Sequence, residues 1–421
     1  MQELKLDVLV IGFGKAGKTI AMKRAASGDR VAIVEKSPEM YGGTCINIAC
    51  IPTKKLLTEA ARGVEYSQAR VNRDAFIAKL NAANKALAEG KGVMIIDGVA
   101  RFTGAHTVVV GDNHDGEQLV IEAETIVINT GAENRIKPSG KVHDSTSIQR
   151  LPKAPETLGV VGAGPIGLEF ATMFNGFGTK VTVYNGGGSF LPMFDADIAE
   201  AVRSQLTVQG IEIVDEEVAD FSLLPQEAVL VAIGRSPVVS GLGLEAAGIE
   251  FSARGIIVDE HCQTNIPGVY AVGDVNGGPQ FTYISYDDHR VVLSHRWGDG
   301  SYTREGRIFP TTTFLNPPLS SIGMTESQAR EVAEIEVKKA NIADIPILPR
   351  PKILGQPEGV AKFILDAKTN QILGATLYCV DSQELINMVA LAINNQIPAK
   401  RVGAGIYTHP ATAELFNALL D

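Results

Sequence analysis

The pattern of hydrophobic and polar positions predicts strands that alternate with helices in the N-terminal half. Apolar, β-branched runs at 7–11 and 31–34 are typical of buried strands, and the residues between them, up to about Ser27, carry a helical pattern. The same order of strand, helix and strand recurs at 158–161, 168–177 and 180–184. Because strands joined by helices usually lie parallel in one sheet, the pattern predicts an α/β protein with two such folds.

The remaining pattern predicts a long helical region, further strands and a C-terminal α+β domain. Residues 53–90 are rich in Ala, Lys and Glu and predict helix, and the Pro-containing stretch 151–155 predicts a linker. A small sheet between the halves of the first domain is expected from strand-like runs near 93–96, 107–110 and 118–121. Other strands are expected at 125–132, 228–235, 256–258, 268–272, 361–365 and 371–378. A helix over 384–395 has an apolar face that suits a core or a subunit interface, made of Ile386, Val389, Ala390 and Ile393.

Length, composition and charge exclude several classes of protein. The chain has 421 residues, 45% hydrophobic and 20% charged, which predicts about two to three domains with a core in each. A net charge of −10 lacks the basic footprint of a nucleic-acid-binding protein. No apolar run approaches the roughly 18 residues of a membrane span, and the N-terminus lacks the basic start of a signal peptide. We therefore expect a cytoplasmic protein that binds neither membrane nor nucleic acid.

The turn after the first predicted strand carries the glycine pattern of a dinucleotide-binding fold. Gly12, Gly14 and Gly17 form GxGxxG, and an acid, Glu35, ends the second strand. The glycines let the backbone approach a pyrophosphate at a helix N-terminus, and the acid binds the ribose hydroxyls. The same stretch also spells GxxxxGKT, the phosphate loop of nucleoside triphosphatases, but only the dinucleotide interpretation explains Glu35.

The glycine pattern recurs in the second predicted fold, at Gly162, Gly164 and Gly167. Two such folds predict two nucleotides, a flavin and a nicotinamide; the alternative is that one fold has lost its ligand. The second strand of this fold ends at Tyr184 without a Glu or Asp for a 2′-hydroxyl, and no Arg stands nearby for a 2′-phosphate. NADH and NADPH both stay open, with a slight preference for NADPH because no carboxylate excludes its phosphate.

Two of the four cysteines, Cys45 and Cys50, lie close together in GGTCINIACIPTK. In a reducing compartment a close cysteine pair is more often catalytic or metal-binding than structural. A zinc site needs about four ligands, and the chain has no second cysteine pair to supply them. Cys262 and Cys379 lie outside any motif and are expected to be ordinary buried thiols.

With these motifs in order, the chain resembles the FAD-dependent pyridine nucleotide–disulfide oxidoreductases, which include glutathione reductase, dihydrolipoamide dehydrogenase and mercuric reductase. The resemblance covers nearly the whole chain: the first GxGxxG, GGTCINIACIPTK, a Thr-Gly turn, the second GxGxxG, AIGR, YAVGD and a C-terminal His-Pro. Within the family, MYGGTCINIACIPTK, TYISYDDHR and FLNPPLSSIGMTE are most similar to the bacterial reactive-chlorine-resistance and hypothiocyanous-acid reductases.

The resemblance implies a role for each matching residue near the flavin. Cys45 would be the interchange thiol that attacks the oxidant, and Cys50 would lie against the flavin and receive its electrons. Lys54 and Glu169 match the ion pair beside the reactive nitrogen of the flavin. Asp274 matches the residue that binds the ribityl chain. Further cofactor-binding positions implied by the matching motifs are Lys36, Gly43, Thr44, Thr130, Gly131, Gly234, Arg235 and Gly273.

The resemblance also implies a homodimer. His409 and Glu414 match the C-terminal His-Pro…Glu motif, in which the His protonates the leaving thiol and the Glu orients it. In the family this His serves the active site of the partner subunit. The site would then be complete only in the dimer.

The expected architecture is therefore two dinucleotide-binding (Rossmann-like) domains and a C-terminal α+β dimerisation domain. FAD would be bound by residues 1–150 and 237–306, NAD(P)H by 151–236, and the subunit interface would be formed by 307–421. The chain is shorter than its relatives, chiefly between Gly210 and Ala228, where little room is left for a β-meander. The sequence leaves open whether this shortness is native.

The expected function is NAD(P)H-driven, FAD-dependent reduction of a small oxidant, hypothiocyanous acid by the subgroup resemblance. Alternatives within the class are a disulfide or metal-ion reductase acting on glutathione disulfide, lipoamide, mercury or copper. The terminal cysteine pair of mercuric reductase is absent from the sequence, which disfavours mercury. From other classes, a flavin-dependent NAD(P)H oxidase, a redox sensor and a non-enzymatic binding module stay open.

Overall fold

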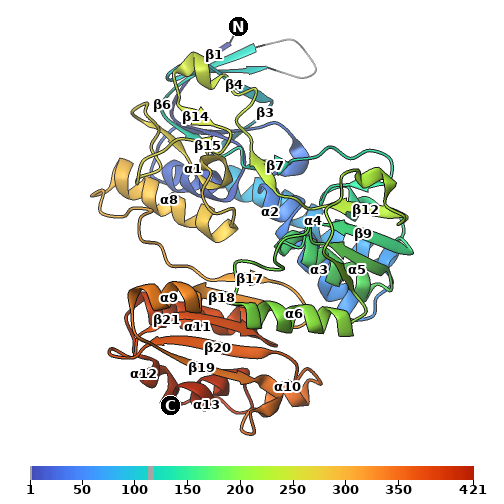
Figure 1. Cartoon of the computed structure of the whole chain (residues 1–421). Coiled ribbons are helices and arrows are strands. Elements are labelled where there is room, and N and C mark those ends of the chain that lie inside the picture. The colour runs from blue at the N-terminus through green and yellow to red at the C-terminus, as the bar shows by residue number, and fades with distance from the viewer. Residues whose placement is uncertain (1, 112–117) are drawn as a thin grey trace. The chain divides into compact units, whose positions relative to one another are not determined.

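A computed structural model describes residues 2–111 and 118–421 (Figure 1). The chain forms two compact units. Unit 1 consists of Met1–Leu56, Ser67–Lys137 and Gly234–Gly306. Unit 2 consists of Leu57–Tyr66, Pro138–Ile233 and Arg307–Asp421. The three-domain division expected from the sequence stays a prediction.

Unit 1 is built on a seven-stranded sheet in the order β3-β2-β1-β6-β5-β4, with β16 paired to β6. The strands β1, β2, β3, β6 and β16 all run parallel, and β5 and β4 continue the sheet in antiparallel order. This confirms the parallel sheet that the alternation of strands and helices predicts. The strands are β1 Gln2–Ile11, β2 Val31–Glu35, β3 Met94–Asp97, β4 Val99–Gly104, β5 Thr107–Gly111, β6 Gln118–Ile128 and β16 Val269–Ala271.

The expectation of a separate small sheet is wrong, because its strands extend the main sheet. The runs at 118–121 and 125–132 are expected as two strands but form the single strand β6 over Gln118–Ile128. Glu122 and Glu124 are exposed and Ala123 between them is buried, so the polar stretch is a strand with one wet face rather than a break. One edge of β6 pairs with β1 and the other with β5 and β16, and β4 is a strand that the sequence pattern did not predict.

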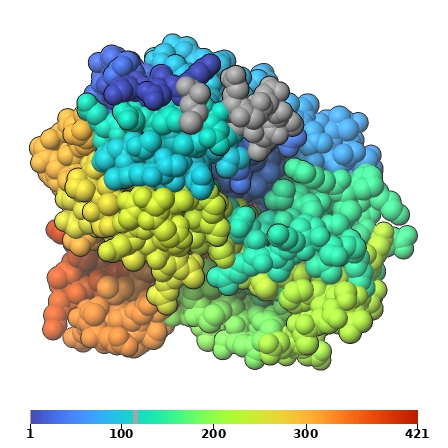
Figure 2. Space-filling view, turned by 90° about the horizontal axis from the view of Figure 1, so that it is seen from above, coloured from blue at the N-terminus to red at the C-terminus, as the bar shows by residue number. Residues whose placement is uncertain are grey.

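Helices and loops cover both faces of this sheet. On β1, Leu9 and Ile11 face one core and Val8 and Val10 face the other, as the two-residue period of a strand requires. On one face α1 packs against α8. On the other, α7 packs against β4. Figure 2 shows the yellow part of the chain against the cyan part on this side of the molecule. The helices are α1 Lys15–Ala26, α2 Thr44–Asn47, α3 Cys50–Ala61, α4 Tyr66–Glu89, α7 Leu244–Ala247 and α8 Thr282–Trp297.

Two short strand pairs complete unit 1. The strand β7 (Ala132–Asn134) pairs antiparallel with β13 (Arg235–Pro237), and β14 (Phe251–Ser252) pairs antiparallel with β15 (Gly255–Ile256). The strand expected at 228–235 therefore divides into β12 and β13, which lie in different units.

Unit 2 contains a second parallel sheet, in the order β11-β10-β9-β12-β8. This confirms the second dinucleotide-binding fold in its strand order and direction. The short Gly210–Ala228 region contains β11 and one turn of 3₁₀ helix, and no meander forms. The elements are β8 Val142–His143, β9 Thr157–Val161, α5 Pro165–Gly176, β10 Lys180–Tyr184, α6 Ala196–Val208, β11 Glu212–Val214 and β12 Ala228–Val231.

The C-terminal part of unit 2 is an antiparallel sheet in the order β17-β18-β21-β20-β19, covered by helices. The apolar face expected on the helix over 384–395 packs into the core of this region, with Ile386 and Val389 fully buried. The elements are β17 Thr311–Thr313, β18 Leu319–Gly323, α9 Glu326–Val332, β19 Ile335–Asn341, α10 Pro349–Ile353, β20 Val360–Asp366, β21 Ile372–Tyr378, α11 Ser382–Asn394, α12 Ala399–Gly403 and α13 Leu415–Leu420.

A buried lysine joins the C-terminal sheet of unit 2 to the starts of α6 and α9. The Lys362 ammonium on β20 contacts Asp195 Oδ2 at 2.9 Å, Asp197 Oδ1 at 3.1 Å and Glu326 Oε2 at 2.9 Å, and its side chain is 3% exposed. Burial disfavours the charged form, but the three carboxylates outweigh burial and raise the pKa of Lys362. Asp195 also accepts from Glu326 N at 3.0 Å and so ties the start of α6 to α9.

We expect Lys362→Met to lower the free energy of unfolding by about 3 kcal/mol, because it leaves buried carboxylates without their cation. Chemical denaturation of the FAD-loaded protein measures the change. Lys339→Met is the matched control, since Lys339 binds Asp197 at 2.7 Å with a side chain 38% exposed. An exposed pair contributes less than about 1 kcal/mol. Equal losses from the two variants would contradict a special role for Lys362.

Candidate active site

The first glycine turn is held by an asparagine that the sequence analysis missed. Gly12 has φ +95°, and a Cβ there would lie 2.5 Å from the Asn129 carbonyl oxygen, so only glycine fits. Gly17 N donates to Asn129 Oδ1 at 2.9 Å, and Asn129 Nδ2 donates to Val272 O at 2.7 Å. The buried Asn129 side chain thus fixes β6, β16 and the start of α1 to one another. Its place in the TIVINTGA run was the available signal.

Glu35 lies where the dinucleotide fold requires an acid, at the end of β2. Its side chain is buried, with Oε2 accepting from Phe13 N at 2.9 Å and Oε1 from Ser37 N at 3.2 Å. Burial raises the pKa of Glu35, against the effect of these hydrogen bonds. A carboxylate oxygen has two lone pairs, so a ribose hydroxyl still finds an acceptor here. Lys36, the next residue, is exposed.

The cysteine loop packs directly on the first glycine turn. Gly43 has φ +83°, and a Cβ there would lie 2.9 Å from Gly14 Cα. Asn47 closes the loop by donating to Gly43 O at 2.9 Å and to Tyr41 O at 3.0 Å. The loop therefore places α2 and the start of α3 beside the glycine turn.

The structure brings Cys45 and Cys50 together as two half-buried thiols. Cys45 lies in the four-residue helix α2, and Cys50 is the first residue of α3, where the helix field favours a thiolate. The hydrogen bond to the Cys50 sulfur, together with burial, raises the pKa of Cys45. The Thr282 hydroxyl lies 3.6 Å from Cys50 Sγ and also bonds Cys45, which lowers the pKa of Cys45. Thr282, at the start of α8, was missed by the sequence analysis although it opens TYISYDDHR.

The other residues predicted to bind FAD lie along one edge of the unit 1 sheet. The glycine turn follows β1, Glu35 ends β2, Thr130 follows β6, and Gly273 follows β16. These four strands are parallel, so their carboxyl ends meet at the same edge, which is where α/β sheets bind dinucleotides. The residues present therefore fit FAD in their chemistry and in their place.

Several polar contacts support this edge. The Thr130 hydroxyl donates to Val238 O at 3.0 Å, and a Cβ at Gly131 would lie 3.8 Å from Thr44 Oγ1. Gly273 N donates to the buried Asp288 at 2.8 Å. Asp274 is half-buried; burial raises its pKa and the positive charge of Arg235 lowers it. Arg235 donates to Asn134 Oδ1 at 3.0 Å and also to Ala132 O, and it follows Gly234, which has φ +108°.

The second glycine turn, in unit 2, has the same construction. Gly162 has φ +107°, and a Cβ there would meet the Ala232 carbonyl oxygen, while Gly167 packs closely on the preceding strand. A Cβ at Gly164 would meet no described atom within 4 Å, so the backbone is open to a ligand where a nicotinamide pyrophosphate would lie. These residues fit NAD(P)H.

No acid or Arg follows β10 closely in the sequence, but the expectation that neither lies near the end of this strand is wrong, because the folded chain brings both there. Asn185 Nδ2 donates to Asp215 Oδ1 at 2.9 Å, and Arg203 donates to the same oxygen at 2.6 Å. Both hydrogen bonds lower the pKa of Asp215. Asp215 follows β11 and Arg203 lies on α6, so sequence distance hid the contact. A carboxylate and a guanidinium side by side leave NADH and NADPH both open.

His409 and Glu414 form the predicted pair. His409 Nδ1 lies 2.8 Å from Glu414 Oε1, and Ala411 N donates to Glu414 Oε2 at 2.9 Å. The backbone bond and then the bond with His409 lower the pKa of Glu414. The His409 side chain is 70% exposed and the Glu414 side chain 16%, so a fixed carboxylate orients an imidazole that faces outward. This arrangement suits a proton donor to another molecule.

The predicted ion pair of Lys54 and Glu169 stays a prediction. Lys54 lies on α3 in unit 1, and Glu169 lies on α5 in unit 2. Glu169 is buried and accepts from Phe314 N at 3.0 Å. The other two cysteines, Cys262 and Cys379, are fully buried, and burial, with Asp381, raises the pKa of Cys379 to about 12.

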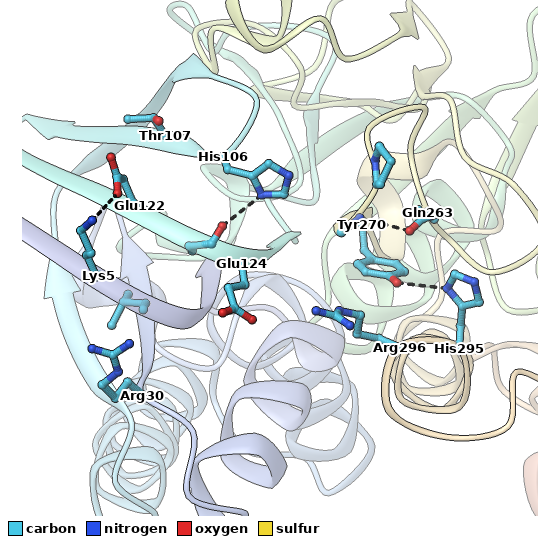
Figure 3. A pocket seen from close by; sticks show the side chains of 14 residues that line it. Lys5, Arg30, His106, Thr107, Glu122, Glu124, Gln263, Tyr270, His295 and Arg296 are labelled. Atoms are coloured by element: carbon cyan, nitrogen blue, oxygen red, sulfur yellow. Dashed lines mark hydrogen bonds and ion pairs between the residues drawn. The ribbon is translucent and has the colours of Figure 1, made fainter.

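A pocket of about 960 Å³ in unit 1 contains none of the predicted site residues (Figure 3). Its lining includes Lys5 in the first half of β1, Arg30 just before β2 and Gly268 just before β16. It therefore lies at the opposite end of these strands from the glycine turn.

In the described part of the chain, no group of three or more metal-ligating side chains is placed to hold a metal ion. No helix among residues 2–111 and 118–421 is long and apolar enough to cross a membrane.

Comparison with known proteins confirms the family that the motifs predict. Residues 6–288 match the model of the pyridine nucleotide-disulphide oxidoreductases, and residues 309–419 match the dimerisation domain of the same family, which supports a homodimer. The chain is 40% identical over 442 aligned residues to the probable pyridine nucleotide-disulfide oxidoreductase RclA of Escherichia coli, with 99% of each chain covered. It is 30% identical over 454 residues to the mitochondrial dihydrolipoyl dehydrogenase 2 of Arabidopsis thaliana, covering 97% of this chain and 88% of the relative.

A solved structure agrees over the whole length. The chain matches the Cu(II) complex of the HOCl-induced flavoprotein disulfide reductase RclA from Escherichia coli with a TM-score of 0.94 and 39% identity, covering 99% of both chains. The two matched domains and these relatives establish the fold as two Rossmann-like domains and a dimerisation domain. The chain therefore belongs to the pyridine nucleotide-disulfide oxidoreductases, a family of enzymes that use FAD and NAD(P)H.

Proposed function

We propose that this enzyme reduces a small oxidant with electrons from NAD(P)H, using Cys45 and Cys50 as a redox-active dithiol. The observation that carries the proposal is the contact between the two thiols at the start of α3, with the Thr282 hydroxyl against both. Thiols in contact can close to a disulfide, and the start of a helix favours the thiolate that such exchange requires. FAD, when bound, returns two electrons from NAD(P)H to the disulfide.

The dithiol step balances for a two-electron oxidant. The Cys45 thiolate attacks the electrophilic sulfur of hypothiocyanous acid, which forms a sulfur–sulfur bond and releases hydroxide. The hydroxide takes a proton and becomes water. The Cys50 thiolate then attacks the Cys45 sulfur, so that the disulfide forms and thiocyanate leaves. Cys50 is the first residue of α3, where the helix field favours a thiolate, so the second attack finds its nucleophile ready.

Hypothiocyanous acid is the proposed oxidant because of the subgroup to which the motifs point. The solved relative is named an HOCl-induced flavoprotein disulfide reductase, which supports a role in defence against reactive chlorine and its products. An oxidant of this size also needs no groove beyond access to Cys45, which is half-buried. A cytoplasmic location follows from a dithiol that works in the reduced state.

The second candidate substrate is Cu(II), favoured by one specific observation. The relative of known structure is described as a Cu(II) complex, and thiolates are soft ligands that suit Cu(I), the product of a one-electron reduction. Two Cu(II) ions would each take one electron from the dithiol and leave as Cu(I). This alternative uses the same two cysteines and differs only in the substrate that they reduce.

We further propose that His409, oriented by Glu414, acts in the partner subunit's site as the group that delivers a proton during thiol exchange. Its exposed imidazole and the match to a dimerisation domain support this assignment. The remaining predicted cofactor residues, together with the pair Lys54 and Glu169, keep their proposed roles. The proposed domain division is 1–150 with 237–306 for FAD, 151–236 for NAD(P)H and 307–421 for the interface.

A steady-state panel of oxidants tests the proposed substrate. With NADH and with NADPH, we expect kcat/KM for hypothiocyanous acid to exceed that for glutathione disulfide, lipoamide, Cu(II), Hg(II) and oxygen by at least about tenfold. The loss of NAD(P)H absorbance with time measures each rate. A higher kcat/KM for Cu(II) would identify Cu(II) as the substrate in place of hypothiocyanous acid. NAD(P)H oxidation that is equally fast with oxygen as the sole acceptor would identify an oxidase.

A further inference from the structure

Lys18 is a buried cation beside the cysteine loop. It lies in the first part of α1, its relative exposure is 6%, and its ammonium donates to Asn84 Oδ1. Lysine is among the residues least often buried, and a buried ammonium normally has a carboxylate partner. Here the hydrogen-bond acceptor is a neutral amide oxygen. Burying an ammonium costs free energy of desolvation, so a nearby negative charge that offsets this cost is expected.

The charged and titratable groups that act on Lys18 are Lys15 and Cys45. Burial, together with repulsion from Lys15 one turn earlier on α1, lowers the pKa of Lys18 to about 8, and the Cys45 sulfur acts in the opposite direction. The effect is mutual, because the positive charge of Lys18 lowers the pKa of the Cys45 thiol. The other groups that act on Cys45 are Cys50 and the Thr282 hydroxyl.

The packing keeps this ammonium in place. Asn84 on α4 is fixed by its own bond from Nδ2 to Leu80 O at 2.8 Å. A Cβ at Gly42 would lie 3.1 Å from Asn84 Cγ, so the asparagine side chain fills the space between the cysteine loop and α4. Lys18, Asn84 and the loop that carries Cys45 therefore form one packed group of α1, α4 and α2.

The two cysteines have unequal support from their own helices. Cys50 begins α3, a helix of 12 residues, whereas Cys45 lies in α2, which has only four residues. The field at a helix end comes from aligned peptide dipoles, so a single turn offers little of it. Once Cys50 is a thiolate it also disfavours a second negative charge on Cys45. Cys45 therefore needs a cation more than Cys50 does.

We propose that Lys18 is a positioning residue for the proposed reaction: its ammonium, held by Asn84, favours the thiolate form of Cys45 and so accelerates attack on the oxidant. The inference rests on the proposed function of the dithiol and adds a residue that no motif of the family marks. Its consequence is a pH window. Below about pH 8 Lys18 is charged and supports the thiolate, and above that pH it is neutral and the support is lost.

The test measures alkylation of Cys45 by iodoacetamide in the FAD-loaded Cys50→Ser protein, as a function of pH. Cys262 and Cys379 are fully buried, so Cys45 carries the label. We expect Lys18→Gln in this background to slow alkylation about tenfold near pH 7, the effect of one pKa unit. The difference shrinks above about pH 8, where the parent protein also loses the charge. Lys18→Arg is expected to retain the parent rate within about threefold.

The matched control is Lys23→Gln, which removes one positive charge from an exposed position on the same helix. It is expected to change the rate by less than about twofold, because exposed charges are screened by salt. Equal pH profiles for Lys18→Gln and the parent would overturn the proposal, as would an equal loss in Lys23→Gln. If Lys18→Gln does not retain FAD, the pH profile of alkylation in the parent Cys50→Ser protein tests the proposal instead. A plot of the logarithm of the alkylation rate against pH that has a slope below one between about pH 7 and pH 9 supports the proposal. A plot that fits the ionisation of a single group overturns it.

Failure of the proposed function is recognised separately. The wild-type enzyme reduced with about one equivalent of NAD(P)H must show the long-wavelength charge-transfer band of a thiolate against the flavin. A wild type without this band overturns the dithiol function, whatever Lys18 does. The band together with an unchanged Lys18→Gln profile overturns only the role of Lys18.

Discussion

Cys45→Ser is expected to lower turnover of the proposed oxidant by at least about 10³-fold while NAD(P)H still reduces the bound flavin. A serine hydroxyl ionises far above the pH at which the enzyme works, and neither Lys18 nor Thr282 can make it a nucleophile comparable to a thiolate. Stopped-flow reduction by NAD(P)H and steady-state turnover with the oxidant measure the two halves of the reaction. Undiminished turnover would show that Cys45 is not the attacking thiol.

Cys50→Ser completes this prediction by removing the other thiol. We expect this variant to lose both turnover and the charge-transfer band, because no thiolate then stands at the start of α3. Cys379→Ala is the control, since it removes a thiol fully buried in the core of unit 2. The control is expected to keep the band. A band that survives in Cys50→Ser would assign the contact with the flavin to Cys45.

Mixed dimers of Cys45→Ser and His409→Ala are expected to regain activity that neither homodimer has. If His409 serves the partner's site, a mixed dimer has one site with both substitutions and one with neither. Random exchange makes half of the dimers mixed, so about a quarter of the wild-type activity returns. The homodimer of His409→Ala is expected to lose about 10²- to 10⁴-fold in turnover, the usual contribution of a positioned acid.

The outcome distinguishes two arrangements of the site. If His409 acts within its own chain, each chain of the mixed dimer carries one defect and no activity returns. Glu414→Gln provides a graded control. It keeps a hydrogen-bond acceptor 2.8 Å from His409 Nδ1 but removes the negative charge. We expect its loss in turnover to be smaller than that of His409→Ala, because the amide oxygen still orients the imidazole.

The sequence was sufficient wherever chemistry depends on local spacing. Gly12, Gly14 and Gly17 are needed by one turn, and the same turn recurs at Gly162, so both folds could be predicted. The pair of Cys45 and Cys50 was also local, and the structure brings their thiols into contact. His409 begins the His-Pro pair and Glu414 follows five residues later, so this pair was predicted from the same kind of local spacing.

The sequence was insufficient where a side chain acts across the fold. Asn129 fixes a turn that lies far from it in sequence, and nothing in its neighbours predicts the contact with Gly17 N. Thr282 meets Cys50 from a helix that begins more than two hundred positions later. Asn185 and Arg203 both donate to Asp215 only because α6 and β11 return to the end of β10. Partners of this kind depend on topology, which local pattern does not encode.

Strand limits failed for a related reason. The glutamates of β6 looked like a break because the pattern was judged on hydrophobicity alone. A strand with one wet face alternates, and Glu122 and Glu124 are the exposed members of that alternation. The alternation covers only 121–125, and it joins the two apolar runs into one strand.

The contact of Gly43 with Gly14 ties the evolution of two sites together. The carbon that a larger residue would add at 43 has nowhere to go but into the pyrophosphate turn, at 2.9 Å from Gly14 Cα. A residue larger than glycine at 14 would in turn meet the Asn129 side chain. Substitutions at Gly43 and at Gly14 are therefore expected to have effects that do not add.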